Sequence, residues 1–298
     1  MPADRIADAW ARQDAWAGHD AADVRARVRA DLGADSTAFL GCTRCGLEFA
    51  DPPRSWSAGN YPPESYGIAW DHLRALALLR MEAPLRLLEI GCADGKFLER
   101  AVALGHRATG IDFGRAAVEA AQARGLDAHV ADVREVRAFA GPEPFGCVAL
   151  FQVIEHLEAP DDVFEAIGAV AAPDARLLIG CPADRRYTRR VGHAERIGRS
   201  DFWDYPPQHV LRWTPDALRI FLGRHGWTLV SAEYEPFDRV GAAAHLTAVS
   251  GRAGGWIGSP LRRRATTAGY LARLAAARLL GPMSGIRLSA VARREGVG

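Results

Sequence analysis

The chain has 298 residues, of which 49% are hydrophobic and 24% are charged, a composition typical of a soluble enzyme with one large core or one core and a cap. A formal net charge of +1 argues against a dedicated nucleic-acid-binding protein. Because residues 1–30 lack the apolar core of a secretion signal and no run of about eighteen apolar residues could span a bilayer, we expect a cytoplasmic protein.

The first part of the chain, residues 1–66, is predicted to be a helical segment followed by a knuckle-like turn. An amphipathic helix is expected over 5–31, with four apolar residues available to pack: Ile6, Trp10, Val24 and Val28. Cys42 and Cys45 then have the spacing of half a zinc knuckle. Structural zinc needs four ligands and no second pair accompanies them, so the sequence favours a turn without metal. Residues 51–63, rich in Pro, Ser, Gly and Asn, predict a linker.

The central part of the chain alternates between strands and helices. After a helix over 69–81, strands are predicted at 85–90, 107–112, 126–130, 145–150 and 174–181, with helices at 96–104, 114–124 and 160–172. Such alternation predicts an α/β fold, a Rossmann-like doubly wound parallel sheet covered on both faces. The carboxyl ends of its strands then lie at one edge, where ligands bind. Cys92, Cys147 and Cys181 lie in or beside these strands and are expected to be buried.

A glycine-rich turn follows the first of these strands. Gly91 and Gly95 let backbone N–H groups approach a ligand closely, and the N-terminus of the next helix favours a carboxylate or a phosphate. Asp112 ends the second strand with a carboxylate that can accept hydrogen bonds from both hydroxyls of a ribose. This order of strand, turn, helix, strand and acid predicts a site for an adenosyl group.

Two acids near the turn distinguish between possible ligands. A dinucleotide-binding fingerprint has a third glycine where this chain has Asp94. A carboxylate there would repel a pyrophosphate but can accept hydrogen bonds from an ammonium group, and Glu89 adds a second acid on the same side. The sequence therefore favours a ligand with an amino-acid end. A nicotinamide-dependent oxidoreductase and a non-catalytic scaffold remain as alternatives.

Residues 85–235 resemble the class I S-adenosylmethionine-dependent methyltransferases, in particular the group that includes ubiquinone-biosynthesis-type O-methyltransferases. Residues 89–95 are similar to the first motif of that family, E-x-G-x-G-x-G, with Ala93 in place of the middle glycine. Residues 112–113, 131–133 and 151–157 are similar to the next three motifs. The resemblance implies S-adenosylmethionine as cofactor, held by Glu89, Gly91, Ala93, Asp94, Gly95, Asp112, Phe113, Asp132, Val133 and Phe151.

The same resemblance implies methyl transfer to a small molecule, for which a hydroxyl group is our first expectation. His156 and His209 are candidates for the general base, with an imidazole pKa near working pH. Each histidine has a structural alternative: His156 could cap a helix or hydrogen-bond backbone carbonyls, and His209 could hold its loop. Relatives that bind a divalent ion through this loop carry an acid where this chain has Gln152, so no metal is predicted.

Residues 182–213 have no clear periodicity and are rich in arginine and aromatic residues. Long irregular connections of this kind are usually functional, so we expect the acceptor, a planar or anionic small molecule, to lie under this segment. Thr214 and Pro215 then predict the N-cap and first residue of a helix.

The C-terminal part is strongly basic. Residues 251–283 are predicted to form a basic helical insertion, and 286–291 fit the last antiparallel strand that relatives have. The methyltransferase domain is accordingly expected to comprise 67–250 and 284–295. A basic amphipathic helix can bind an anionic membrane or a partner, but we expect this one to pack on its own sheet, where it could cover the mouth of the site. The oligomeric state does not follow from the sequence.

Overall fold

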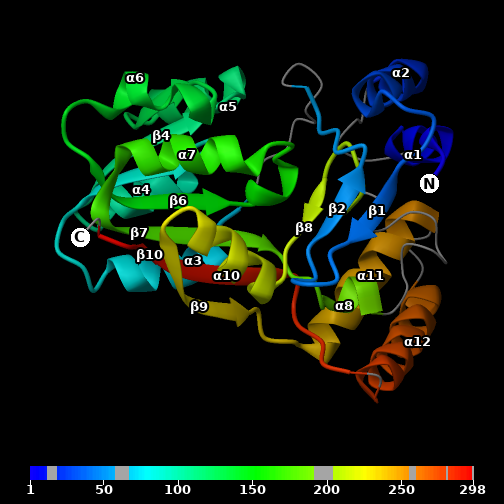
Figure 1. The fold of residues 1–298 in the computed structure, drawn as a ribbon. Helices are drawn as coiled ribbons and strands as arrows, with labels where there is room; N and C mark the ends of the chain where they lie inside the picture. The colour runs from blue at the N-terminus through cyan, green and yellow to red at the C-terminus, as the bar shows by residue number, and fades with distance from the viewer. Residues whose placement is uncertain (12–18, 58–66, 191–203, 255–259, 280, 297–298) are drawn as a thin grey trace.

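A computed structural model describes residues 1–11, 19–57, 67–190, 204–254, 260–279 and 281–296. Its centre is a seven-stranded sheet with the order β5-β4-β3-β6-β7-β10-β9 (Figure 1). The first five strands in this order are parallel, and β10 runs antiparallel to both β7 and β9. The predicted Rossmann-like fold with a last antiparallel strand is confirmed.

The strands of this sheet are β3 (Arg86–Ile90), β4 (Arg107–Asp112), β5 (Asp127–Val130), β6 (Phe145–Phe151), β7 (Ala171–Pro182), β9 (Trp227–Tyr234) and β10 (Arg287–Arg294). One face is covered by α3 (Trp70–Leu79), α4 (Lys96–Ala103) and α5 (Arg115–Ala123). The other face is covered by α6 (Arg137–Ala140), α7 (Pro160–Val170) and α10 (Pro215–Arg224).

Burial on both faces explains why the central strands form where they do. Leu87 and Leu88 are consecutive residues of β3 that point to opposite faces, and both are fully buried. They face Cys147 and Val148 of β6 in register. Cys92, Cys147 and Cys181 are free and buried, as expected. The edge strand β9 was not predicted, because its residues alternate in exposure and Val230 is 64% exposed.

The N-terminal segment contains two helices, so the single helix predicted over 5–31 is wrong. α1 (Ala3–Trp10) and α2 (Ala21–Leu32) are distinct, and residues 12–18 lie outside the described part. Asp20 begins α2 because its side chain accepts hydrogen bonds from the backbone N–H groups of Ala22 and Asp23. The apolar residues expected to pack are buried, as a set: Ile6, Trp10, Val24 and Val28.

A small second sheet lies beyond the carboxyl ends of the main strands (Figure 1). Its order is β1-β2-β8, formed by the hairpin of β1 (Ala38–Gly41) and β2 (Glu48–Asp51) with β8 (Leu211–Arg212). Cys42 and Cys45 lie in the connection of this hairpin. Because β8 lies between β7 and β9 in sequence, this pairing fastens the N-terminal segment to the carboxyl edge of the main sheet.

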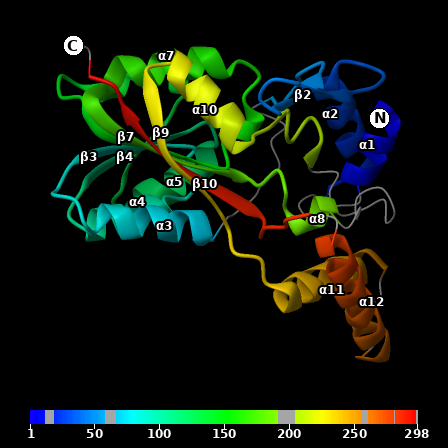
Figure 2. The same cartoon turned by 60° about the horizontal axis from the view of Figure 1, so that its bottom comes forward.

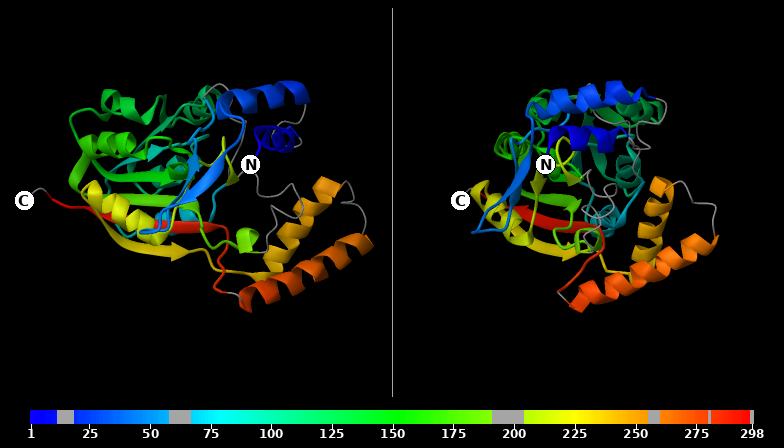
Figure 3. Two further views of the ribbon diagram at one scale, coloured as in Figure 1. Left: turned by 45° about the vertical axis from the view of Figure 1, so that its right-hand side comes forward. Right: turned by 90° about the vertical axis from the view of Figure 1, so that its right-hand side faces the viewer.

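Two helices between β9 and β10 form a projecting pair, which we call the arm (residues 239–283; Figures 2 and 3). They are α11 (Arg239–Gly254) and α12 (Pro260–Leu279). The helical insertion therefore begins at Arg239 and not at residue 251, the start that we expected. The expectation that the basic helix packs on its own sheet is wrong. Instead, Tyr270 and Leu274 of α12 pack in a cluster with Leu246 of α11. No helix of the described residues is long and apolar enough to cross a membrane.

Candidate active site

The glycine turn between β3 and α4 has the shape expected for a ligand cradle. Gly91 and Gly95 have φ angles of 74° and 77°, which favour glycine. The backbone N–H groups of Gly91 and Cys92 donate to the carbonyl of Ile111, at 2.8 and 3.1 Å, and this ties the turn to β4. A Cβ atom at Gly95 would lie 2.5 Å from Leu126 Cδ1. The turn is therefore fixed tightly against its neighbours.

Asp112 is held at the carboxyl end of β4 by two backbone groups. Its Oδ2 accepts from the N–H of Ala93 at 2.9 Å, and its Oδ1 accepts from the N–H of Gly114 at 2.7 Å. These bonds fix the carboxylate beside the glycine turn, while each oxygen keeps a lone pair for a further donor. Phe113, the next residue, lies at the same edge and is 47% exposed.

Glu89, at the buried end of β3, has an oxygen atom without a partner. The residue is 3% exposed and its Oε2 accepts no hydrogen bond from the described residues. Burial, together with the charge of Asp112, raises its pKa well above the ordinary value. A ligand ammonium group would satisfy this oxygen and favour the ionised carboxylate. The site therefore fits the amino-acid end of S-adenosylmethionine.

Asp94 and Asp132, two other predicted cofactor contacts, already have partners. Asp94 forms an ion pair with Lys96 at 2.8 Å. Asp132 caps η2 (Val133–Glu135) and accepts from the backbone N–H and the Nε of Arg134, both at 2.8 Å. The hydrogen bonds of Arg134 lower the pKa of Asp132. Asp132 follows β5, the strand next to β4, so it lies along the same edge as Asp112.

Phe151, at the end of β6, belongs to the core beneath this edge. It is 6% exposed, and its ring centroid lies 4.7 Å from that of Phe97 and 4.3 Å from that of His72. Gln152 follows with a positive φ of 56°, and its side-chain amide donates to Asp71 at 3.1 Å. The loop beyond Phe151 is thus anchored to α3.

The two candidate bases lie side by side, with ring centroids 4.9 Å apart. His156 ends η3 (Ile154–His156), and its Nδ1 donates to the carbonyl of Gln208, which can only accept. The Nδ1 of His209 lies 3.2 Å from an oxygen of Asp204. The Nε2 atoms of both histidines face Glu155, at 3.9 and 4.0 Å from its Oε1. The structure therefore joins residues that are far apart in sequence.

Burial controls the protonation of this cluster. It lowers the pKa of His156 to about 3, with a further contribution from the charge of His209. It also lowers the pKa of His209, although Asp204 opposes the change. Burial raises the pKa of Glu155 to about 8. The expectation of an imidazole pKa near working pH is therefore wrong for His156, because the ring has lost its hydration.

Glu155, His156 and His209 form the one group of three possible metal ligands among the described residues, with ligand atoms within 4.8 Å of one another. Neutral imidazoles with a carboxylate suit divalent transition metals. Among the described residues, Cys42 and Cys45 have no third metal-ligating side chain beside them. The absence of a metal stays a prediction.

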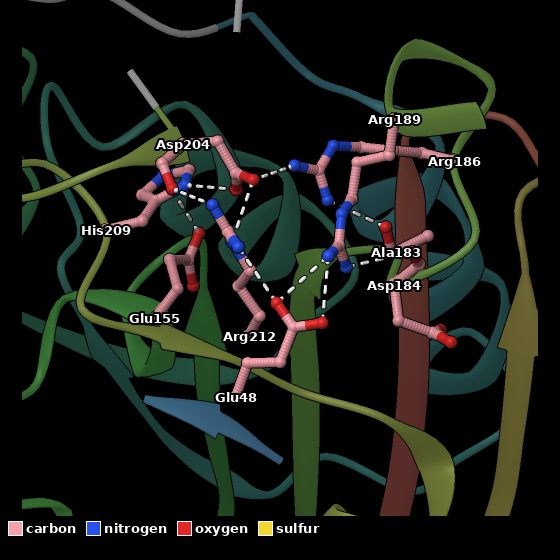
Figure 4. Close-up of polar contacts among 9 residues, drawn as sticks. All are labelled: Glu48, Glu155, Ala183, Asp184, Arg186, Arg189, Asp204, His209 and Arg212. Atoms are coloured by element: carbon pink, nitrogen blue, oxygen red, sulfur yellow. Dashed lines mark hydrogen bonds and ion pairs between the residues drawn. The ribbon is translucent and has the colours of Figure 1, made fainter. Parts of the chain in front are cut away.

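An ionic network links this cluster to the N-terminal hairpin (Figure 4). Asp204 pairs with Arg186 and with the Nε of Arg212, the latter at 2.8 Å. Arg212 and Arg189, on β8 and α8 (Tyr187–Arg190), both pair with Glu48 of β2 at 2.8 Å. Sequence patterns did not indicate Glu48, Asp204 and Glu155 as site residues, since each has a partner far away along the chain.

A polar cavity of about 410 Å³ adjoins this network. It lies between the hairpin and the residues that follow β7, and it is lined by Gly46, Glu48, Asp184, Arg189, Arg212 and Thr214. Residues 191–203 of the segment expected to cover the acceptor lie outside the described residues. The position of the acceptor under that segment therefore stays a prediction.

Comparisons with known proteins agree with this geometry. Residues 66–232 match the family model described as a methyltransferase domain. A ubiquinone biosynthesis O-methyltransferase from Hahella chejuensis is 35% identical over 98 residues, which are 31% of this chain and 41% of that protein. Its counterpart from Caulobacter sp. is 28% identical over 149 residues, 48% of this chain and 52% of that protein. The chain thus spans about half the length of these relatives.

Among solved structures, a SAM-dependent methyltransferase from Archaeoglobus fulgidus has a similar fold. The match covers 75% of this chain and 94% of that one, with a TM-score of 0.50 and 15% identity. At this identity the likeness concerns the fold.

Proposed function

This chain belongs to the class I S-adenosylmethionine-dependent methyltransferases, and we propose that it transfers a methyl group from S-adenosylmethionine to a hydroxyl group of a small molecule in a biosynthetic pathway. One observation carries the proposal: the Asp112 carboxylate is fixed beside a glycine turn and near the buried Glu89, whose Oε2 has no hydrogen-bond partner among the described residues. The sulfonium of the cofactor supplies an activated methyl group, so the protein has mainly to align the acceptor and exclude water.

Each cofactor contact has a proposed role. Glu89 and the turn hold the methionine end, and Asp112 holds the ribose hydroxyls. Phe113, Asp132 and Val133 line the adenine side. Asp132 would exchange part of its interaction with Arg134 for the adenine amino group, a change open to it because both side chains are partly exposed. Phe151 supports the floor of the site from the core. The turn residues in this set are Gly91, Ala93, Asp94 and Gly95.

The choice of a hydroxyl acceptor is supported by the names of the similar proteins and by the histidine cluster. Of the two histidines, we assign the role of general base to His209 in preference to His156. Asp204 lies against the Nδ1 of His209 and stabilises the imidazolium form, which leaves Nε2 as the acceptor. His156 has a backbone carbonyl in that position, and burial lowers its pKa to about 3.

Calorimetric titration tests the proposal first. We expect micromolar binding of S-adenosylmethionine and S-adenosylhomocysteine, weakened roughly 100-fold in Asp112→Ala because two charge-assisted hydrogen bonds are lost. Binding of NAD without either adenosyl ligand would support the oxidoreductase alternative. Binding without methyl transfer to any hydroxyl, amine or thiol acceptor would support a scaffold.

Metal dependence is tested in the same methyl-transfer assay. We propose catalysis without a metal, so removal of divalent ions with a chelator should leave the rate unchanged. If the chelator removes activity and a divalent ion restores it, and if the ion fails to restore activity in Glu155→Ala, the cluster of Glu155, His156 and His209 would instead be a metal site.

A further inference from the structure

The arm carries a concentrated positive charge. Residues 239–283 contain seven arginines and neither Asp nor Glu. Because the whole chain has a formal charge of +1, the residues outside the arm carry six more acids than bases. The arm is thus a cationic projection on an anionic body, and it extends from the side of the molecule where the carboxyl edge of the sheet lies (Figures 1 and 3).

The helix α12 has two apolar stripes, of which only one is covered. Tyr270, Leu274 and Ala277 are buried and pack toward α11. At about 100° per residue, a second stripe lies on the opposite side of the helix. It consists of exposed residues: Ala265, Ala268, Ala272, Ala275, Ala276 and Leu279. Leu279 is 88% exposed.

Arginines border this second stripe on both sides. The helical periodicity places Arg264 and Arg278 along one margin and Arg273 along the other. The ion pairs among the described residues include none of these three arginines, and the arm itself contains no acid. An exposed apolar stripe bordered by arginines is an arrangement with which a helix can lie on an anionic membrane surface. Nucleic-acid backbones, in contrast, are bound through polar and charged contacts and need no such stripe.

We propose that the arm binds the surface of an anionic lipid bilayer, with the stripe of α12 facing the acyl boundary and Arg264, Arg273 and Arg278 facing lipid phosphates. The negative body then faces away from the bilayer. Because the arm and the candidate site lie on the same side of the sheet, this orientation brings the site close to the bilayer. The inference rests on the arm alone and does not depend on the methyl-transfer proposal.

Co-sedimentation of the full chain with vesicles tests this. We expect the protein to pellet with vesicles that contain phosphatidylglycerol, to stay in solution with pure phosphatidylcholine, and to be released by salt. The triple variant Arg264→Glu, Arg273→Glu and Arg278→Glu should lose at least roughly 100-fold in partitioning. A second variant, Ala272→Glu with Ala276→Glu, leaves the arginines in place and should also fail to bind.

A matched control changes the charge by the same amount on the body. Arg100, Arg137 and Arg293 are exposed, and their triple replacement by Glu should preserve most of the vesicle binding. Circular dichroism melting curves should show that every variant is folded. The proposal is overturned if the full chain ignores anionic vesicles at low salt, or if control and arm variants lose binding equally. Capture of an RNA duplex by the arm in place of vesicles would overturn it as well.

Discussion

Gly110 shows how closely the cofactor turn is tied to the sheet. A Cβ at this position in β4 would lie 2.5 Å from Leu98 Cδ1, 2.7 Å from Cys92 Sγ and 2.8 Å from Cys92 Cβ. The Leu98 methyl can rotate away, but Cys92 Cβ moves only with the backbone of the turn. We expect Gly110→Ala to lower the free energy of unfolding by about 1–3 kcal/mol and to weaken S-adenosylhomocysteine binding about tenfold.

Urea unfolding and calorimetry check this expectation, with Gly223→Ala as the control. Gly223 lies in α10 with no atom within 4 Å of its added Cβ. There, alanine should stabilise the helix by up to about 1 kcal/mol and leave binding unchanged. Equal effects of the two variants would show that the close contact of Gly110 with Cys92 is unimportant.

Glu155 should make stability fall as the pH rises. The folded protein keeps the Glu155 proton up to a pKa of about 8, whereas an exposed Glu in the unfolded chain releases it near 4.5. Between these values the folded state binds more protons, so its stability decreases with pH, by at most about 1.4 kcal/mol per unit. His156, with its pKa lowered to about 3, acts in the opposite direction only below its ordinary value of 6.5.

The window from pH 6.5 to 8 lies above the ordinary pKa of histidine, so the decline there comes from buried carboxyl groups, Glu155 and also Glu89, whose pKa burial raises. Glu155→Gln, which mimics the protonated form, should reduce the decline seen in the parent protein when urea unfolding is repeated across this window. The control Glu119→Gln, at an exposed position, should leave the decline in stability unchanged. A parent protein whose stability is constant in this window would show that Glu155 ionises without penalty.

At the residue scale, the sequence predicted the cofactor side of the site better than the acceptor side. Gly91, Gly95 and Asp112 lie within one short stretch whose backbone order already determines their geometry. Glu155 and Asp204, in contrast, gain their environment from ion pairs and burial created by the hairpin and by β8. The spacing of residues along the sequence does not indicate such long-range contacts, so the lowered pKa of His156 could not be predicted.

At the scale of elements, α10 depends on a cap that also holds the N-terminal hairpin. The Thr214 hydroxyl accepts from the N–H of Ala217 at 3.0 Å and donates to the carbonyl of Cys45 at 2.8 Å. Thr214→Ala should lower the free energy of unfolding by about 1–2 kcal/mol, because both bonds are lost. Thr214→Ser keeps the hydroxyl and should retain most of the stability in the same thermal melt. If serine is as harmful as alanine, methyl packing rather than capping explains the effect.

Predictions of elements succeeded where burial on two faces or a cap produced a clear signal. Strands β3, β4 and β6 each contain a continuous run of buried residues, and Thr214 with Pro215 begins α10 as expected. The prediction failed where two elements shared one periodicity. Asp20 separates α1 from α2, yet the apolar spacing continues across it. The half-exposed edge strand β9 offered no such run.

At the scale of the whole molecule, the arm is an addition to a sheet that closes without it. Backbone pairing continues where β9 ends and β10 begins. The N–H of Gly285 donates to the carbonyl of Glu235 at 2.8 Å, and the N–H of Glu235 donates to the carbonyl of Arg287 at 2.9 Å. A short turn could therefore connect the two strands directly, as in an ordinary antiparallel hairpin. The arm is held mainly by its own cluster and by Tyr187 of α8.

We therefore expect a chain in which residues 238–283 are replaced by a short Asn-Gly turn to fold and to bind S-adenosylhomocysteine within about threefold of the parent, while losing its affinity for anionic vesicles. Some stability should be lost, because the deletion removes His245 and with it the hydrogen bond of the Tyr187 hydroxyl. Calorimetry and vesicle co-sedimentation on the same preparation check both properties. A folded variant that no longer binds the cofactor would show that the arm completes the active site, and a variant that still binds vesicles would place the lipid contact on the body.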